Sequence, residues 1–281
     1  MSALTGTGIW SGELRRTGDD GERREAAAEL EALGYSALWF PGGQGGPVFE
    51  AADLLLGATE RVTVATGILN VWRHTPAEAA EGHRRLRTAH GDRFVLGIGI
   101  GHAQSVEEYR RPLTKMREYL SELDVPRDER ILAALGPKML DLAREQSLGA
   151  HPYFVPVEHT RIARERLGPD AVLAPEQAVV LEADPGRARA IARLHVERYL
   201  RLPNYTNNLL RVTEFSEDDL REGGSDRLVD AVVAWGDEAA IRARLDAHRA
   251  AGADHVCIQV IHGRDGELPL PEWRALASAL L

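Results

Sequence analysis

Residues 62–102 read VTVATGILNVWRHTPAEAAEGHRRLRTAHGDRFVLGIGIGH, and this stretch decides the fold. It opens and closes with apolar runs rich in β-branched residues, at 62–69 and 94–100, which are typical of strands buried on both faces. Between them lies a helix-length segment in which Thr75 can cap the first turn and Pro76 suits the first helical position. Parallel strands need a crossover of this kind, so the stretch predicts one βαβ unit.

Glycines stand where both of these strands end. Gly67 falls near the end of the first run, and the end of the second run carries Gly97, Gly99 and Gly101, followed by His102. Because glycine has no side chain, it lets a flat ligand approach the backbone closely, which favours a floor for a planar ring. The alternative is that these glycines only relieve crowding inside a barrel, and composition favours neither interpretation.

The composition is that of an ordinary globular protein. The chain has 281 residues, of which 44% are hydrophobic and 27% charged, enough for one large domain, 1–281, without a second core. The 43 acidic against 34 basic residues give a formal charge of -9, which disfavours a nucleic-acid partner and an anionic membrane surface. We therefore expect a small-molecule partner.

Cysteine usage and hydropathy bear on the cellular compartment. Cys257 lies inside the apolar run HVCIQVI, and as the single cysteine it is expected to be a buried structural thiol. No apolar stretch has membrane-spanning length, and the first residues, MSALTGTGIW, lack a signal core. These features predict a soluble protein of the reducing cytoplasm.

Strand-like and helix-like segments alternate along the whole chain. Helices are marked by apolar positions at three-and-four spacing and by stops such as Gly34. Eight alternating pairs over this length predict a (β/α)8 barrel; an open doubly wound sheet is the alternative, which the lack of a GxGxxG motif disfavours. The predicted strands are 7–10, 35–40, 62–69, 94–100, 129–135, a short strand with its trailing loop at 148–155, 177–182 and 255–261.

Two segments stand outside this alternation. Residues 41–47, PGGQGGP, are too rich in glycine and proline for an element and form a loop at the end of a strand, where barrel enzymes keep their chemistry. Residues 202–224, after the seventh strand, are neither strongly periodic nor low in complexity, and they predict an inserted lid or cavity wall. Residues 226–235 and 237–251 are predicted to be two further helices.

The triplet Gly136-Pro137-Lys138 opens a helix directly after a predicted strand. Free backbone N–H groups and the positive end of the helix favour an anion there, with Lys138 close by. An ordinary helix start with proline in its first turn is the alternative. The position on the active face of a barrel favours the anion site.

Three histidines, His74, His102 and His151, follow strand ends, and each could move a proton near neutral pH or serve only as a hydrogen-bonded structural group. The sequence has no HxH, HExxH or carboxylate cluster at ligand spacing and no GxSxG elbow, so neither a catalytic metal nor acyl transfer is expected. An organic cofactor would supply the demanding chemistry.

Six motifs together resemble the luciferase-like flavin and deazaflavin monooxygenase superfamily, over nearly the whole chain. The likeness is strongest to a group of oxidoreductases that depend on the deazaflavin coenzyme F420. The motifs are GIWSGEL (8–14), ATGILN (65–70), RFVLGIGIGH (93–102), LAALGPKMLDLA (132–143), GAHPYFVPVEHT (149–160) and LAPEQAVVLEADP (173–185).

The resemblance implies where a cofactor binds. A non-prolyl cis peptide, here Gly67-Ile68, would back the flavin or deazaflavin ring, and the strand end that carries Gly99, Gly101 and His102 would pack beside it. The turn that binds the cofactor phosphate corresponds to Leu135, Gly136, Pro137 and Lys138. We assign proton transfer to His102 and His151 and substrate binding to Trp10, Phe40 and Tyr205.

The resemblance also sets limits on the reaction. Deazaflavin-dependent sugar-phosphate dehydrogenases carry a histidine after strand two and a glutamate after the strand-four glycines, whereas this chain has Phe40-Pro41-Gly42 and His102 there. We therefore expect hydride transfer between coenzyme F420 and a different small organic substrate. The alternatives are an FMN-dependent monooxygenase and a barrel that binds a ligand without catalysis. The resemblance further implies a homodimer.

Overall fold

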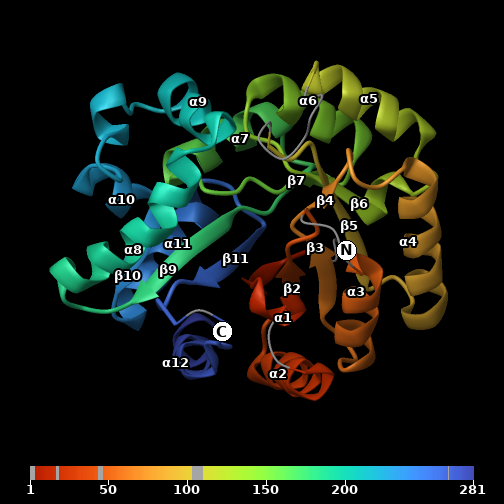
Figure 1. The fold of residues 1–281 in the computed structure, drawn as a ribbon, viewed down its shortest axis with the longest axis horizontal. Coiled ribbons are helices and arrows are strands. Elements are labelled where there is room, and N and C mark those ends of the chain that lie inside the picture. Colours follow the sequence, from red (N-terminus) through yellow and green to blue (C-terminus); the bar gives the residue numbers. More distant parts are fainter. Residues whose placement is uncertain (1–3, 17–18, 44–46, 103–109, 265) are drawn as a thin grey trace.

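The computed structural model describes residues 4–16, 19–43, 47–102, 110–264 and 266–281. Figure 1 shows the strands at the centre of the molecule and the helices around them. The strands are β1 (Gly6–Trp10), β2 (Ala37–Phe40), β3 (Thr63–Thr66), β4 (Leu69–Asn70), β5 (Phe94–Gly99), β6 (Arg130–Leu132), β7 (Gly149–Ala150), β8 (Val172–Leu173), β9 (Glu176–Leu181), β10 (Val233–Gly236) and β11 (His255–Val260).

Helices connect these strands on the outside of the sheet (Figure 1). Two short 3-10 turns lie at Arg127–Glu129 and Glu217–Leu220. The α-helices are α1 (Glu13–Arg16), α2 (Asp20–Leu33), α3 (Val48–Gly57), α4 (Pro76–His90), α5 (Pro112–Glu122), α6 (Pro137–Gln146), α7 (Val157–Leu167), α8 (Pro185–Leu200), α9 (Pro203–Val212), α10 (Asp226–Val232), α11 (Glu238–Ala250) and α12 (Leu270–Leu280).

The strands of the described residues pair in parallel, in the order β10-β9-β11-β1-β2-β3-β5-β6-β7-β8, with β4 paired to β5. The segment 172–181 bonds to β11 on one edge and to β7 on the other, and so connects the two sides of the sheet. Asp254 N donates to Leu173 O at 2.9 Å on the β11 side, and Ala174 N donates to Ala150 O at 2.9 Å on the β7 side. The predicted α/β architecture with a parallel sheet is confirmed, and the curvature agrees with a (β/α)8 barrel.

The βαβ unit predicted from residues 62–102 is confirmed. β3 and β5 pair in parallel, with Val64 opposite Phe94, and α4 forms the crossover. Thr75 caps α4 through its side chain, which accepts from Glu78 N, and Pro76 occupies the first turn. The local signals and the tertiary pairing agree here, which explains why the sequence pattern was sufficient.

Some elements differ from the prediction. The predicted helix 226–235 was wrong in its second half, because α10 ends at Val232 and 233–236 forms the strand β10. Its apolar run, LVDAVVAW, suits either a helix or a buried strand, and pairing with β9 decides for the strand. Residues 148–155, predicted as a short strand with its trailing loop, form a strand at 149–150, and β8 was not predicted.

The segment 202–224 is more regular than its sequence suggested. It contains α9, which begins with Pro203 in its first turn, and the 3-10 turn Glu217–Leu220, closed by a capping box between Ser216 and Asp219. Figure 1 shows α9 beside α6 and α7, at the edge of the molecule. That the segment 202–224 is an inserted lid or cavity wall remains a prediction.

Residues along each strand alternate between an outer and an inner core. In β2, Leu38 and Phe40 belong to the cluster that includes the helices α2 and α3, whereas Ala37 and Trp39 belong to the cluster inside the sheet. This alternation follows from the two-residue repeat of a strand. The inner cluster also contains several aromatic side chains, including Tyr153.

Several histidines are buried, some in the region of the sheet and others in the helices around it. Burial, the largest cause in each case, lowers the pKa of His83, His151 and His255 to about 4 and that of His195 and His248 to about 3. His248 illustrates the structural role: its Nδ1 lies 2.8 Å from Thr160 Oγ1 and its Nε2 lies 2.8 Å from Gln177 Oε1, an arrangement that suits the neutral ring.

We predict that acid destabilises the protein well above the range of carboxylate titration. The unfolded chain binds protons on these histidines near pH 6.5, while the folded chain resists them until about pH 4, so the free energy of unfolding falls as the pH drops through this window. Each such histidine contributes a loss of roughly 1–2 kcal/mol between pH 7 and pH 5. Urea unfolding midpoints at both pH values measure this loss, and a His248→Gln variant should show a smaller one. Equal midpoints at pH 7 and pH 5 would contradict the prediction.

Candidate active site

The predicted site residues follow the carboxyl ends of neighbouring parallel strands. Gly67 comes after β3, Gly101 and His102 after β5, Gly136 just after β6 and His151 after β7. Because parallel strands end on the same side of a sheet, these positions share one rim, which is where barrel enzymes bind their substrates. The site therefore has to be sought there.

The Gly67-Ile68 peptide bond is cis, as the sequence resemblance implied. Gly67 N donates to Phe40 O at 2.8 Å, which ties the bond to the end of β2. A Cβ placed on Gly67 would lie 2.4 Å from Trp10 Nε1 and 3.2 Å from His151 Nε2. The structure thus brings Trp10 and His151 against the glycine of the cis bond, and a side chain there would displace them.

The other strand-end glycines are closely packed by the protein itself. A Cβ on Gly97 would lie 1.8 Å from Thr66 O, and one on Gly99 would lie 2.4 Å from Ile68 Cγ1. Gly101 has φ +65. The crowding interpretation therefore accounts for Gly97 and Gly99, since the space beside them is filled.

His151 is held in one tautomer at this rim. Its ring stacks on Trp39 with centroids 4.3 Å apart, and its Nδ1–H donates to Ala174 O at 2.7 Å. The carbonyl can only accept, so the proton is on Nδ1 and Nε2 keeps its lone pair. His151 Nε2 and Trp10 Nε1 are both buried, and neither has a hydrogen-bond partner among the described residues. An acceptor and a donor therefore stand unpaired beside Gly67.

His102 lies against α9 rather than against His151. Its Nδ1 is 3.0 Å from Asn204 Oδ1, and its ring centroid is 5.5 Å from that of Tyr205. Burial lowers the pKa of His102, and the hydrogen bond to Asn204 opposes this effect in part. His102 is therefore a half-buried imidazole that is neutral at physiological pH.

An aromatic chain joins the predicted substrate residues. Tyr153 lies between Trp10, at 5.3 Å, and Tyr205, at 6.1 Å, measured between ring centroids. The Tyr153 hydroxyl donates to Gln259 Oε1 at 2.6 Å and lies 2.7 Å from the hydroxyl of Tyr199. Trp10, Tyr205 and, through Tyr205, His102 are thus brought together, whereas the Phe40 side chain lies in the outer core with the helices.

Sequence reasoning missed Tyr153 and Glu176. Tyr153 stands two residues after His151, a spacing at which extended chain presents both side chains to one face, so the signal was available. Glu176 is buried at the start of β9; its Oε2 accepts from Phe154 N at 3.2 Å, and its Oε1 has no partner. Burial raises the pKa of Glu176 to about 8, so its carboxyl group is protonated at neutral pH.

A cavity of about 760 Å³ opens beside the start of α6. Gly136 is the N-cap of this helix, no side chain caps it, and a Cβ on Gly136 would meet no atom within 4 Å. Lys138 is exposed and is not among the lining residues. The cavity is lined by Leu135, Gly136, Pro137, Leu140, Ile162, Glu165, Arg166, Asn204, Asn207, Asn208, Arg211 and Val212.

This cavity has the features of an anion site. It combines an uncapped helix start with the guanidinium groups of Arg166 and Arg211, of which Arg166 already pairs with Asp141. Asn208 on its α9 wall is 5% exposed, and neither atom of its amide has a partner. The segment predicted as a cavity wall thus supplies one side of the cavity next to the predicted phosphate turn.

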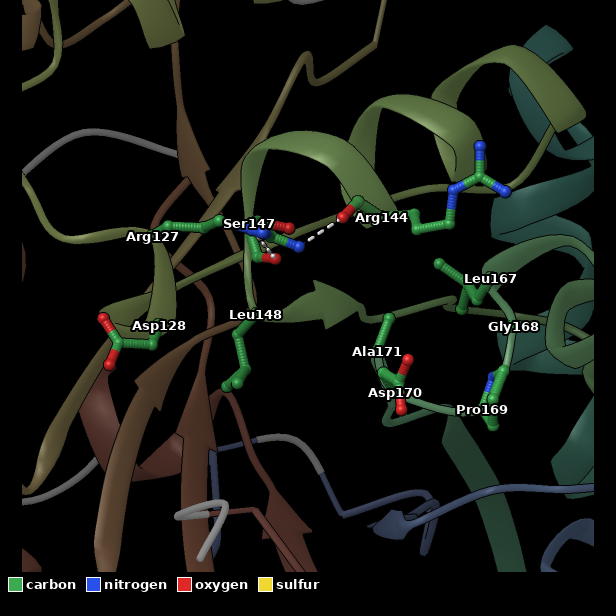
Figure 2. A pocket seen from close by; sticks show the side chains of 10 residues that line it. All are labelled: Arg127, Asp128, Arg144, Ser147, Leu148, Leu167, Gly168, Pro169, Asp170 and Ala171. Carbon is green, nitrogen blue, oxygen red and sulfur yellow. Dashed lines mark hydrogen bonds between the residues drawn. The ribbon is translucent and has the colours of Figure 1, made fainter.

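A second cavity, of about 530 Å³, lies at the opposite ends of the strands (Figure 2). Its residues Asp128, Leu148 and Ala171 precede β6, β7 and β8, so it faces the amino ends of the sheet. The Arg127 side chain crosses it and donates to Arg144 O at 2.6 Å and Ser147 O at 3.2 Å. These hydrogen bonds connect the turn before β6 to the end of α6. They are remote from the rim that carries the predicted site.

Metal sites, membrane-spanning helices and the cysteine are three further features to consider. Within the described residues, no group of three or more histidine, cysteine, aspartate or glutamate side chains is placed to hold a metal ion. Across that same part of the chain, no helix combines the length and apolarity needed to cross a membrane. Cys257 is buried as a free thiol, as predicted.

Comparison with known proteins gives one family and several similar structures. Residues 7–124 match the family model described as luciferase-like monooxygenase. A Mycobacterium tuberculosis protein, provisionally assigned as a coenzyme F420-dependent oxidoreductase, is 26% identical over 145 residues, which cover 48% of this chain and 41% of the relative. The aligned part thus spans less than half of that relative.

The solved structures match over almost the full chain at low sequence identity. An F420-dependent secondary alcohol dehydrogenase with a bound F420-acetone adduct has a TM-score of 0.75 at 13% identity, covering 100% of this chain and 98% of the other. The oxygenating constituent of 3,6-diketocamphane monooxygenase from Pseudomonas putida, with FMN, has a TM-score of 0.70 at 12% identity, covering 99% and 97%.

A coenzyme F420-dependent tetrahydromethanopterin reductase from Methanopyrus kandleri has a TM-score of 0.68 at 14% identity and covers 98% of this chain and 97% of the other. At these identities the structures establish the fold. The resemblance to the luciferase-like monooxygenase superfamily is therefore confirmed: residues 7–124 match the family directly, and the whole chain shares the fold of solved enzymes that hold coenzyme F420 or FMN.

Proposed function

We propose that the protein is a coenzyme F420-dependent oxidoreductase that transfers a hydride between the coenzyme and a small organic substrate. The observation that carries this proposal is the uncapped start of α6 at a cavity on the same side of the sheet as Gly67-Ile68. The names of the similar proteins support a deazaflavin or flavin. We further propose a single domain, 1–281, that acts as a cytoplasmic homodimer, which light scattering can test.

The residues around the cavity fit the phosphate of such a coenzyme. The first turn of α6 offers backbone N–H groups and the positive end of the helix dipole to an anion. Arg211 supplies a guanidinium from the facing wall, and Gly136 leaves the approach open. Lys138, exposed at the second position of α6, adds positive charge from solvent.

The rim beside Gly67 fits a planar ring with polar edges. Trp10 Nε1 can donate a hydrogen bond and His151 Nε2 can accept one, and both are buried and unpaired. Ile68, packed against Gly99, extends the same surface together with Gly101. When bound, coenzyme F420 supplies a carbon that accepts or releases a hydride.

The substrate would lie among the aromatic side chains on the other side of that rim. Trp10, Tyr153 and Tyr205 form an apolar, shape-selective wall. His102, neutral and hydrogen-bonded through Nδ1, presents Nε2 as a proton acceptor when the substrate is oxidised and as its donor in reverse. Phe40 would not contact the substrate. It would support β2 through packing, since its side chain lies in the outer core.

We predict that the apoprotein binds coenzyme F420 and that binding depends on the α9 wall. Arg211→Ala removes a cation that lines the cavity and should weaken binding by about 1 kcal/mol, a roughly fivefold rise in Kd. Lys138→Ala should have a smaller effect that disappears at high salt, because that ammonium is solvent-exposed. Fluorescence titration with F420 and, in parallel, with FMN measures both effects.

Tighter binding of FMN than of F420 would favour a flavin-dependent monooxygenase. Tight F420 binding without turnover of alcohols, aldehydes or enones would favour a binding protein without catalysis. Unchanged affinity in both variants would remove the phosphate assignment.

We also predict that His102 sets the pH dependence of hydride transfer. His102→Gln should leave coenzyme affinity nearly unchanged and lower the single-turnover rate by roughly 10²-fold at neutral pH. The wild-type rate of substrate oxidation should fall on acidification, below the ordinary pKa of histidine, because burial lowers the pKa of His102. Stopped-flow absorbance of the coenzyme across pH measures this rate. A variant with the wild-type rate and pH profile would assign His102 to a structural role.

A further inference from the structure

We propose that Asn204 is the positioning residue for His102: its side-chain oxygen holds the imidazole proton on Nδ1 and leaves Nε2 as the atom that exchanges a proton with substrate. This proposal rests on the proposed function for the role of Nε2. The positioning itself stands on the geometry of the two side chains, which come from segments 102 residues apart in sequence.

The hydrogen bond between the two residues has a defined direction. His102 Nδ1 lies 3.0 Å from Asn204 Oδ1, within the range of an N–H···O bond. The amide oxygen can only accept, so the imidazole donates through Nδ1, and a neutral imidazole then has no proton on Nε2. Asn204 therefore selects one of the two tautomers.

The fold fixes Asn204 where it can do this. Asn204 lies in the first turn of α9, after Pro203, and the next residue, Tyr205, is 7% exposed. The Tyr205 ring packs 5.2 Å from Tyr199 and 5.5 Å from Phe154 between centroids. With Tyr205 buried in this aromatic cluster, the start of α9 has little freedom, and Asn204 is held against His102.

The choice of an amide rather than a carboxylate has a chemical consequence. An aspartate at this distance would stabilise the imidazolium and raise the pKa of His102. Asn204 accepts the hydrogen bond without a charge, and the ring facing His102 on α9 is Tyr205, whose pKa burial raises well above its ordinary value. Among the described residues, burial has the largest effect on the pKa of His102 and lowers it, and the other effect is that of the uncharged hydrogen bond to Asn204, which raises it. His102 is thus kept neutral and ready to accept a proton.

Nitrogen-15 NMR of the full-length protein with labelled histidine tests the proposal without coenzyme or substrate. His102→Gln identifies the His102 resonances by their loss. In the wild type at pH 7 we expect His102 with its proton on Nδ1. In Asn204→Ala we expect a mixture of tautomers, and in Asn204→Asp a pKa of His102 that rises by about one to three pH units. Thr206→Ala is the matched control, since within the described part of the chain this α9 side chain bonds only to Pro203 O, in its own helix.

The outcomes separate the positioning from the proposed reaction. If the tautomer and pKa of His102 are the same in wild type, Asn204→Ala and Asn204→Asp, or if Thr206→Ala changes them equally, the proposal is wrong. If they change as expected, single-turnover rates decide the rest. A pH profile of hydride transfer that moves upward in Asn204→Asp supports the full proposal. If Asn204→Ala alters the tautomer but His102→Gln keeps the wild-type rate, His102 has no role in proton transfer. The positioning by Asn204 would then still stand.

Discussion

The structure depends on how one extended segment, 172–181, bonds to strands on both of its edges. The Arg164 side chain, at the end of α7, holds the start of this segment in place. Its guanidinium donates to Gly168 O at 2.5 Å, Ala171 O at 2.8 Å, Gly252 O at 2.9 Å and Asp254 Oδ2 at 2.6 Å. One partly buried cation therefore fixes together the turn before β8 and the turn before β11. Joining the two sides of the sheet in this way encloses an interior.

That interior explains why the site lies at the rim. Bulky rings, above all Trp39 stacked on His151, fill the middle of the barrel, so a ligand cannot enter it. The parallel direction of the strands then leaves the carboxyl-end loops as the place where side chains from distant segments meet. His102 follows β5 and Asn204 begins α9, yet they bond directly because both elements end or start at this rim.

Much of this arrangement could be predicted from sequence because its signals are local. The cap at Thr75, the stop at Gly34, whose φ is 102, and the uncapped start at Gly136 each depend on a few neighbouring residues. The failures involve choices that only tertiary contacts make. Residues 233–236 suit a helix or a strand equally, and β9 selects the strand. A strand pattern places Trp39 and Phe40 on opposite faces but does not say which face is inside.

In the candidate site, too, local motifs predict some features and tertiary contacts decide others. The cis bond at Gly67-Ile68 and the positions of Trp10 and His151 follow from motifs, whereas the partner of His102 does not, because Asn204 lies 102 residues away in a segment without strong periodicity. The two-residue spacing from His151 could have predicted that Tyr153 lies at the site. Its contacts with Tyr199 and Gln259 come from a helix and a strand much later in the chain.

The distribution of charge follows from burial and bears on the chemistry. The chain carries a formal charge of -9, yet the ionisable groups inside the barrel are neutral: burial lowers the pKa of His151 and His255 to about 4 and raises that of Glu176 to about 8. Charged groups are costly in such an interior unless they are paired. The guanidinium groups of Arg166 and Arg211 stand instead at the outer cavity, beside the start of α6. A ligand that suits both regions has an uncharged, flat part for the rim and an anionic part for the cavity.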